Sequence, residues 1–338
     1  MASPTGEAFD EGKMKRNKIL FVLLLLISIT VVCTCGTFFY VKQNNNEAND
    51  DNLLIMTSCN PVYLATINVV GDAEGVTVQN LSQPTTGCLH DYTLTTEDMK
   101  NLSKADVLVV NGGGMEGYLE DVMEAYPNLP IIDTFEYLEH NPKYSDYIAI
   151  KEESHEESEV DHQGQEHHHD HGVNSHIWMS DLLHMGQVEA IAEGLESIDD
   201  SNSTLYEANA KRYIEILSTR VDKQGLDKEL SGANIAILHE AFAYTVDSVG
   251  ANVVADMDLD EERQVSAGEV SEFISAIKEN DVKVVLAEYD YGNAMGKLIT
   301  EQTDAKVVYL ETMVHGQYEQ MDYISVLNKN YANIRSVL

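Results

Sequence analysis

Four polar side chains lie at or just beyond the ends of predicted strands, and their types are those that bind divalent metal ions. They are His90, His176, His239 and Glu311. A single histidine in such a place is more often a structural residue than a ligand, but four equivalent placements favour a shared role. Because ligands collect at the carboxyl ends of strands in open α/β sheets, we expect these side chains to meet in a cleft between two lobes.

A second group of histidines falls in one acidic segment, residues 152–171. Six of the chain's twelve histidines lie there among eight carboxylates: His155, His162, His167, His168, His169 and His171. The segment has almost no apolar side chain, so we expect a loop outside the core. Neutral imidazole binds Zn, Cu and Ni ions, and carboxylates raise the local cation concentration. We interpret the segment as an auxiliary metal-capture loop; the alternative is a solvated acidic loop with incidental histidines.

The overall charge agrees with cation binding. The 338 residues contain 57 Asp and Glu against 21 Lys and Arg, which gives a formal net charge of −36 at pH 7. Such a chain repels phosphate backbones, so nucleic acid is excluded as a partner. With twelve histidines and four cysteines, the composition favours imidazole and carboxylate ligands over thiolates.

The N-terminal region predicts attachment to a membrane. Residues 19–41 form an apolar run long enough to span a bilayer, and Lys13, Lys15, Arg16 and Lys18 precede it. The positive-inside rule then places residues 1–18 in the cytoplasm and everything after about residue 45 on the extracytoplasmic side of the cell membrane. The run is either an uncleaved signal-anchor or a lipoprotein signal. Its continuation through Phe38–Val41 favours the anchor, and Met14 is an alternative start.

The exported part of the chain has two cysteines, Cys59 and Cys88. Disulfides persist in an extracytoplasmic compartment, so we expect these two residues to pair. The alternative is two buried free thiols.

Short β-branched runs alternate with helical patterns from residue 52 onward, which predicts an α/β fold with mainly parallel sheets. Four strands are expected on each side of the middle of the chain, and they suggest two similar lobes. The predicted strands are Leu53–Thr57, Val76–Leu81, Val107–Asn111, Pro130–Asp133, Ile235–Leu238, Asn252–Asp256, Lys283–Glu288 and Lys306–Leu310. The predicted helices include Thr96–Ser103, with Thr95 and Asp98 as a helix-start pair, Glu116–Tyr126 and Ser266–Asn280.

Between the two sets of strands, apolar residues at helical spacing predict one long helix over Thr204–Leu230. This helix either bridges the lobes or is an ordinary surface helix. The predicted organisation is a cytoplasmic segment 1–18, a membrane segment 19–41, a linker 42–51, an N-terminal lobe 52–200, a linking helix 201–230 and a C-terminal lobe 231–338.

From Leu53 to Leu338 the sequence resembles the metal-specific substrate-binding proteins of ABC importers, in the cluster that binds zinc or manganese. The resemblance is carried by His90–Asp91–Tyr92 with Thr95 and Asp98, Ala105–Val107 to Asn111–Gly112, His176–Ile177–Trp178, His239–Tyr244 and Leu310–Glu311. It implies that His90, His176, His239 and Glu311 bind the metal. It also implies two (β/α) lobes joined by one rigid helix, with little hinge closure. Leu89 and Ser175 stand where the family often has proline, and Glu311 stands where aspartate is common.

Three imidazoles and one carboxylate suit four-coordinate Zn²⁺, whereas Mn²⁺ prefers more oxygen ligands. Members that use manganese tend to carry glutamate where this chain has His239, so the resemblance favours the zinc branch, with manganese or mixed use as the alternative. Glu311 is the least certain ligand, and His315 or water can replace it. We expect Glu240, Asp91 and Glu288 to orient the ligands, and Trp178 to pack in the core.

Two enzyme classes fit the sequence less well. Gly112–Gly117 matches a dinucleotide-binding fingerprint, but Glu116 would lie among the amides that should bind a pyrophosphate. A zinc hydrolase is the second alternative, although the chain has no H-E-x-x-H and no G-x-S-x-G motif. A surface adhesin with a structural metal is a third, non-enzymatic alternative.

The function expected from these features is capture of Zn²⁺ outside the cell. The resemblance implies delivery of the ion to an ABC permease that is driven by a separate ATPase subunit, with no reaction catalysed. We expect a monomer tethered to the membrane.

Overall fold

The computed structural model describes residues 52–82, 92–148, 173–257, 259, 265–289, 292–316 and 319–338. Every element below belongs to one compact unit, Leu53–Leu338. No helix among the described residues is long and apolar enough to cross a membrane. The predicted membrane segment 19–41 lies outside the described residues.

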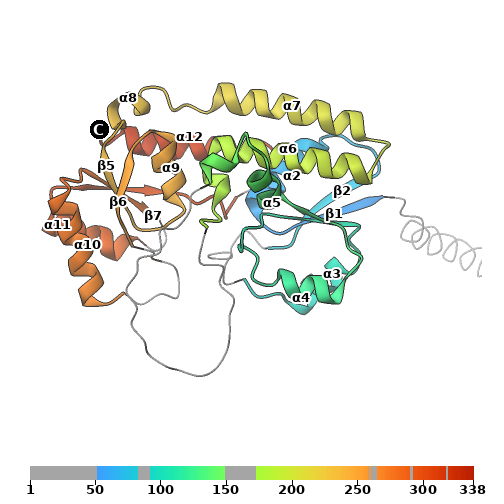
Figure 1. Cartoon of the computed structure of the whole chain (residues 1–338), viewed down its shortest axis with the longest axis horizontal. Helices are drawn as coiled ribbons and strands as arrows, with labels where there is room; N and C mark the ends of the chain where they lie inside the picture. Colours follow the sequence, from blue (N-terminus) through green and yellow to red (C-terminus); the bar gives the residue numbers. More distant parts are fainter. Residues whose placement is uncertain are drawn as a thin grey trace, which may run out of the picture. The chain divides into compact units, whose positions relative to one another are not determined.

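Two four-stranded parallel sheets confirm the predicted α/β fold class (Figure 1). The first sheet has the order β2-β1-β3-β4, and its strands are β1 (Leu53–Thr57), β2 (Val76–Asn80), β3 (Val107–Val110) and β4 (Ile131–Asp133). The second has the order β6-β5-β7-β8, with β5 (Asn234–Ile237), β6 (Asn252–Asp256), β7 (Val284–Glu288) and β8 (Lys306–Leu310). In each sheet the strand order reverses beside the first strand, which makes a switch point where ligands of α/β proteins bind.

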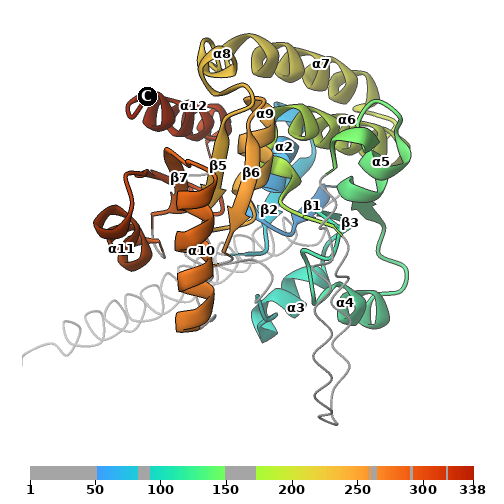
Figure 2. The ribbon, with the colours of Figure 1, turned by 60° about the vertical axis from the view of Figure 1, so that its left-hand side comes forward.

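Helices cover both faces of each sheet. In the first lobe, α3 (Thr96–Leu102) and α4 (Leu119–Ala125) cover one face, while α2 (Asn60–Val70) and α6 (Asp181–Ile198) pack on the other. In the second, α10 (Ala267–Glu279) and α11 (Asn293–Gln302) lie opposite α9 (Phe242–Ser248) and α12 (Asp322–Arg335) (Figure 2). The remaining helices are α5 (Thr134–His140), α7 (Ser203–Arg220), α8 (Leu226–Leu230), η2 (Ser145–Tyr147) and η3 (Ile177–Met179).

Local sequence explains where several helices begin. Thr95 and Asp98 form the predicted capping box of α3, in which each side chain bonds the backbone amide of the other. Ser266 and Glu269 do the same at the start of α10. These reciprocal bonds satisfy amides that have no partner within the helix.

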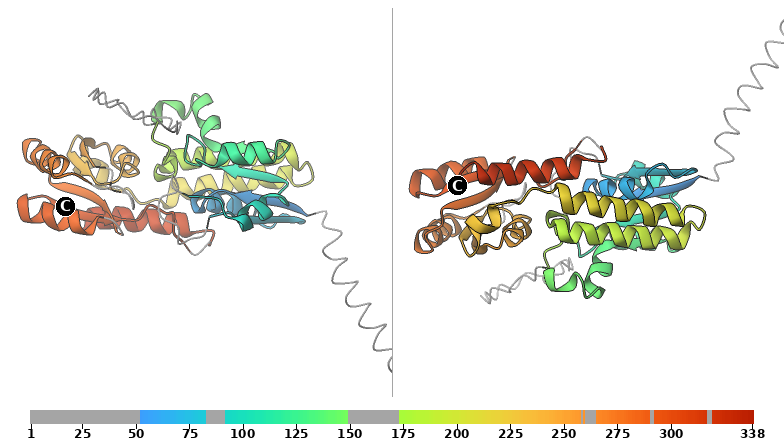
Figure 3. Two further views of the ribbon diagram at one scale, coloured as in Figure 1. Left: turned by 90° about the horizontal axis from the view of Figure 1, so that it is seen from below. Right: turned by 90° about the horizontal axis from the view of Figure 1, so that it is seen from above.

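The continuous helix predicted over Thr204–Leu230 does not form. Helix α7 ends at Arg220, and α8 starts after Gly225, whose φ of 93° is left-handed. The end of α7 is bound by α12 instead: Asn328 donates to the carbonyl of Arg220, and Arg335 donates to the carbonyls of Asp222 and Gln224. Helix α7 lies beside α6 (Figure 3) and packs on α2, both of which precede it in the chain.

One apolar core includes residues from both lobes, and side chains cross between them. The Trp178 indole donates to the carbonyl of Thr312 at 2.7 Å, and the Tyr323 hydroxyl donates to the carbonyl of Trp178 at 2.7 Å. From α2, Asn60 donates to the carbonyl of Met313 and Asn68 to that of Gln320, both at 2.8 Å. Trp178 is fully buried, as predicted. These bonds join the lobes, and the little hinge closure implied by the resemblance stays a prediction.

A buried histidine lies at the junction of three helices. His184 of α6 is fully buried, stacks on Tyr323 of α12 at 3.7 Å between ring centroids, and meets Tyr213 of α7 edge-on. Its Nδ1 lies 3.1 Å from the Gln187 side-chain oxygen. Burial lowers the pKa of His184 from 6.5 to about 4, against a smaller opposing effect of Gln187. The ring is therefore neutral in the folded protein at neutral pH.

We predict that His184 weakens the fold in acid. Its folded pKa lies below its unfolded value, so the unfolded state binds the extra proton and stability is lost as the pH falls from about 6.5 to about 4. A gap of this size corresponds to roughly 3 kcal/mol of unfolding free energy. His184→Phe keeps a flat ring beside Tyr323, and urea unfolding of the metal-free protein should then vary less with pH. Equal pH slopes for the two proteins would contradict the prediction.

Candidate functional site

His176 lies in the buried segment that precedes η3, and only 2% of it is exposed. The side-chain oxygen of Asn174 accepts the backbone N–H of His176 at 3.1 Å and lies 3.0 Å from its Nδ1. Since an amide oxygen only accepts hydrogen bonds, Nδ1 carries the proton. Glu240 Oε1 lies 3.4 Å from the same nitrogen. The lone pair of His176 is therefore on Nε2, as a metal ligand requires.

His239 lies two residues beyond β5, at the switch point of the second sheet. It is 5% exposed, and its Nδ1 lies 3.0 Å from Glu288 Oε2 at the end of β7. The Thr312 hydroxyl donates to the other carboxylate oxygen of Glu288 at 2.7 Å. Burial raises the pKa of Glu288, but His239, Thr312 and the charge of His315 together hold it below its ordinary value. Glu288 is therefore ionised and orients the His239 ring.

The structure brings these two predicted ligands together. The ring centroids of His176 and His239 are 5.0 Å apart and the ring planes are inclined by 81°. Both Nδ1 atoms face carboxylate or amide oxygens, which is the arrangement that fixes metal-binding histidines in proteins. The contacts predicted for Glu240 and Glu288 are thus present.

Glu311 has a different setting. It directly follows β8, and its carboxylate forms an ion pair with Lys329 of α12. Its backbone amide and carbonyl both bond the Asn330 side chain, so the main chain at this position is fixed. His315 is near enough to Glu288 for its charge to lower the pKa of that carboxyl.

Several predicted site residues lie outside the described residues. These are His90, Asp91, Cys88, and the loop histidines His155, His162, His167, His168, His169 and His171. Among the residues that are described, no three His, Cys, Asp or Glu side chains are placed to hold a metal ion. Cys59 is a buried free thiol at the start of α2, and burial raises its pKa to about 12. Its pairing with Cys88 stays a prediction.

Asn174 and Thr312 are site residues that the sequence analysis missed. Each lies within two residues of a predicted ligand, since Asn174 is two residues before His176 and Thr312 directly follows Glu311. Polar side chains are common in loops, so residue type alone does not single out these two residues. They are identified by a contact with a histidine, for Asn174, or with the partner of a histidine, for Thr312, and these contacts are visible only in the folded structure.

The glycine turn after β3 binds a carboxylate of the chain itself. Glu116 is buried and accepts hydrogen bonds from the amides of Asn111 and Gly112, at 2.7 and 2.9 Å, and from the Ser58 hydroxyl at 2.6 Å. Burial raises the pKa of Glu116 to about 7. The Glu116 side chain bonds the backbone amides that would otherwise bind a pyrophosphate, so these amides are not available to a dinucleotide. This is the reason given above, from the sequence, against dinucleotide binding.

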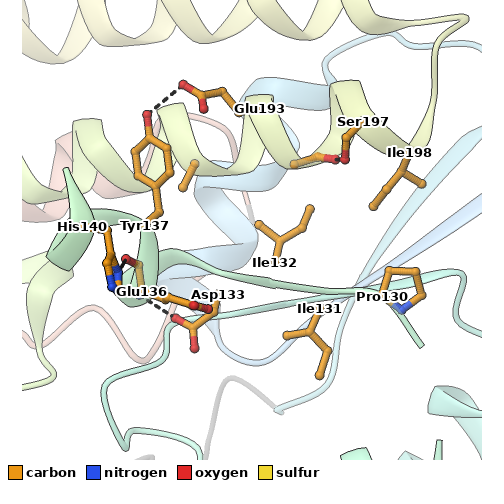
Figure 4. A pocket seen from close by; sticks show the side chains of 12 residues that line it. Pro130, Ile131, Ile132, Asp133, Glu136, Tyr137, His140, Glu193, Ser197 and Ile198 are labelled. Atoms are coloured by element: carbon orange, nitrogen blue, oxygen red, sulfur yellow. Dashed lines mark hydrogen bonds between the residues drawn. The ribbon is translucent and has the colours of Figure 1, made fainter. Parts of the chain in front are cut away.

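A cavity of about 590 Å³ lies along β4, α5 and α6 (Figure 4). Its polar lining comes from six residues, Asp133, Glu136, Tyr137, His140, Glu193 and Ser197. Neither His176 nor His239 lines it, so this cavity is separate from the histidine pair.

Fold and site together define a two-lobed α/β binding protein with paired histidines between its lobes. Comparison with known proteins agrees with this class. The family described as zinc-uptake complex component A, periplasmic, matches residues 55–337. The chain therefore belongs to this family, which consists of transport components and not of enzymes.

Curated relatives include the Bacillus subtilis high-affinity zinc uptake system protein ZnuA, 26% identical over 91% of this chain and 94% of the relative. The Streptococcus pneumoniae zinc-binding lipoprotein AdcA is 24% identical over 90% of this chain, which spans 59% of that relative's length. Among solved structures, FpvC of Pseudomonas aeruginosa in complex with Mn²⁺ has a TM-score of 0.68 and 23% identity over 85% of this chain and 98% of that one. Zn(II)-bound AdcA of S. pneumoniae has a TM-score of 0.64 and 22% identity over 85% and 57% of the respective chains. These structures share the fold.

We predict that Glu288→Gln weakens zinc binding by about 10- to 100-fold, because an uncharged amide oxygen stabilises the Nδ1 proton of His239 less than a carboxylate does. Competition with a chromogenic chelator would measure the change. Asp181 offers a matched control, since it is also a buried carboxylate but pairs with Lys223 and not with a histidine. Asp181→Asn should keep the wild-type affinity, and equal losses in the two variants would contradict a specific role for Glu288.

Proposed function

We propose that this protein captures Zn²⁺ outside the cell and delivers it to an ABC permease driven by a separate ATPase subunit. The observation that carries the proposal is the buried pair His176 and His239, whose ring centroids are 5.0 Å apart and whose Nδ1 atoms each lie 3.0 Å from a side-chain oxygen. Family membership and the zinc-binding names of the relatives support the same cargo.

We assign four ligands to the ion: His90, His176, His239 and Glu311. The histidines come from both lobes, so a bound ion would link the lobes. The Glu311 carboxylate is paired with Lys329, and it must exchange this partner for the ion. His315, four residues after Glu311, is the alternative fourth ligand.

The nitrogen-rich donor set supports Zn²⁺ over Mn²⁺. Zinc accepts three imidazoles and one carboxylate in tetrahedral geometry, whereas manganese prefers oxygen ligands at higher coordination number. Import of manganese, or of both metals, is the second candidate, because a Mn²⁺-bound structure shares this fold.

We further propose that the protein acts as a monomer anchored to the cell membrane, with its binding unit on the extracytoplasmic side. The apolar run 19–41 and the basic residues before it support this location. The lipoprotein name of the streptococcal relative supports an anchored form of attachment.

Titration of the metal-stripped protein with Zn²⁺ and, in parallel, Mn²⁺ against a competing chelator tests the function. We expect one tight zinc site, with manganese bound far more weakly. His239→Ala should abolish the tight site because it removes a ligand, whereas His140→Ala should retain it because His140 is exposed and bonds within its own helix. Equal or tighter binding of manganese would reject the zinc assignment, and wild-type zinc affinity in His239→Ala would reject the ligand set.

The acidic histidine segment 152–171 is proposed to collect zinc for the tight site. Replacing its six histidines by serine keeps its length and charge, and should remove the weaker sites while sparing the tight one. Isothermal titration would count both classes. Loss of the tight site in this variant would contradict an auxiliary role for the segment.

A further inference from the structure

Asn174 makes contacts that reach both of the buried histidine segments. It is 3% exposed, and its side-chain oxygen bonds the backbone amide and Nδ1 of His176. Its side-chain nitrogen donates to the backbone carbonyl of Glu240 at 2.8 Å, next to His239. Its own carbonyl accepts the Tyr244 hydroxyl at 2.5 Å. One amide group thus bonds the segments of both histidines.

We propose that Asn174 is a positioning residue that sets the ring orientation of His176 and ties it to the His239 segment of the opposite lobe. The proposal rests on the proposed function, in which both histidines bind the transported ion. It assigns a role in metal binding to a residue that is not itself a ligand.

The role requires an acceptor and a donor on one planar group. The acceptor oxygen selects the tautomer in which Nε2 of His176 is available to a metal. The donor nitrogen fixes the backbone at Glu240, and the Glu240 carboxylate in turn lies 3.4 Å from His176 Nδ1. There is thus a ring of contacts between the two lobes: Asn174 bonds His176 and the Glu240 backbone, and the Glu240 side chain lies near His176.

Other bonds hold the same segment without touching the ring. Asn111 donates to the carbonyl of Ser175 at 2.8 Å, and Trp178 donates to the carbonyl of Thr312. These contacts place the main chain of the segment. Asn174 in addition fixes the orientation of the His176 imidazole and its distance from His239. The entropic cost of ordering the ligands when the ion binds is therefore smaller.

The test compares Asn174→Ala and Asn174→Asp with a control variant, Asn209→Ala, that also removes a buried side-chain amide. Asn209 of α7 is 9% exposed, and its side chain donates to the carbonyls of Val69 and Val70, away from the histidines. Asn209→Ala therefore controls for general loss of stability. Each full-length protein, in detergent, would be measured for its zinc dissociation constant, its melting temperature and the visible absorption spectrum of its Co²⁺ complex.

We expect both Asn174 variants to bind zinc at least about tenfold more weakly, since partners of metal-binding histidines have effects of this size. Alanine removes both bonds, whereas aspartate keeps the acceptor but sets a carboxylate oxygen against the Glu240 carbonyl. The Co²⁺ spectrum should change in both variants, because it reports ligand geometry. Asn209→Ala should lower the melting temperature yet keep the wild-type affinity and spectrum.

Wild-type affinity and spectrum in Asn174→Ala would overturn the proposal. Wild-type values in Asn174→Asp alone would overturn the link to the opposite lobe. Absence of a tight zinc site in the wild-type protein would instead reject the proposed function.

Discussion

The site depends on the need to satisfy polar backbone groups that are buried where the two lobes meet. Asn174, Ser175 and Trp178 are buried, and their carbonyls accept bonds from Tyr244, Asn111 and Tyr323. A buried carbonyl without a partner costs free energy. The bonds from Tyr244 and Tyr323 cross between the lobes, so they favour the relative position of the lobes that keeps them. The same bonds fix the main chain that carries His176. The same hydrogen bonds to buried carbonyls therefore stabilise the contact between the lobes and fix the geometry of the site.

The two sheets use the same strand order for different purposes. In the first lobe, the switch point between β1 and β3 is filled by the Glu116 carboxylate, which bonds the amides of the glycine turn. In the second, the switch point between β5 and β7 holds His239 and Glu288. The switch point of the first lobe thus binds a carboxyl group of its own chain, whereas that of the second presents an imidazole toward His176.

Much of the fold is predictable from the sequence, because short β-branched runs such as Val107–Val110 strongly favour a buried strand. The predicted strand boundaries agree with the observed ones within one residue. The end of the helix predicted over Thr204–Leu230 is not predictable in this way. It falls at Arg220, where the chain is bound by Asn328 and Arg335, more than a hundred positions further along. His176 and His239 are predictable from residue type and placement. The roles of Asn174 and Thr312 are not, because they arise from contacts that form only in the folded protein.

X-ray absorption at the zinc edge, on protein loaded with one equivalent of Zn²⁺, would show whether histidines of both lobes bind the ion. We expect four nitrogen or oxygen ligands at about 2.0–2.2 Å, with scattering from three imidazole rings. Sulfur at about 2.3 Å, or fewer than two imidazoles, would contradict a site built on the histidines of both lobes.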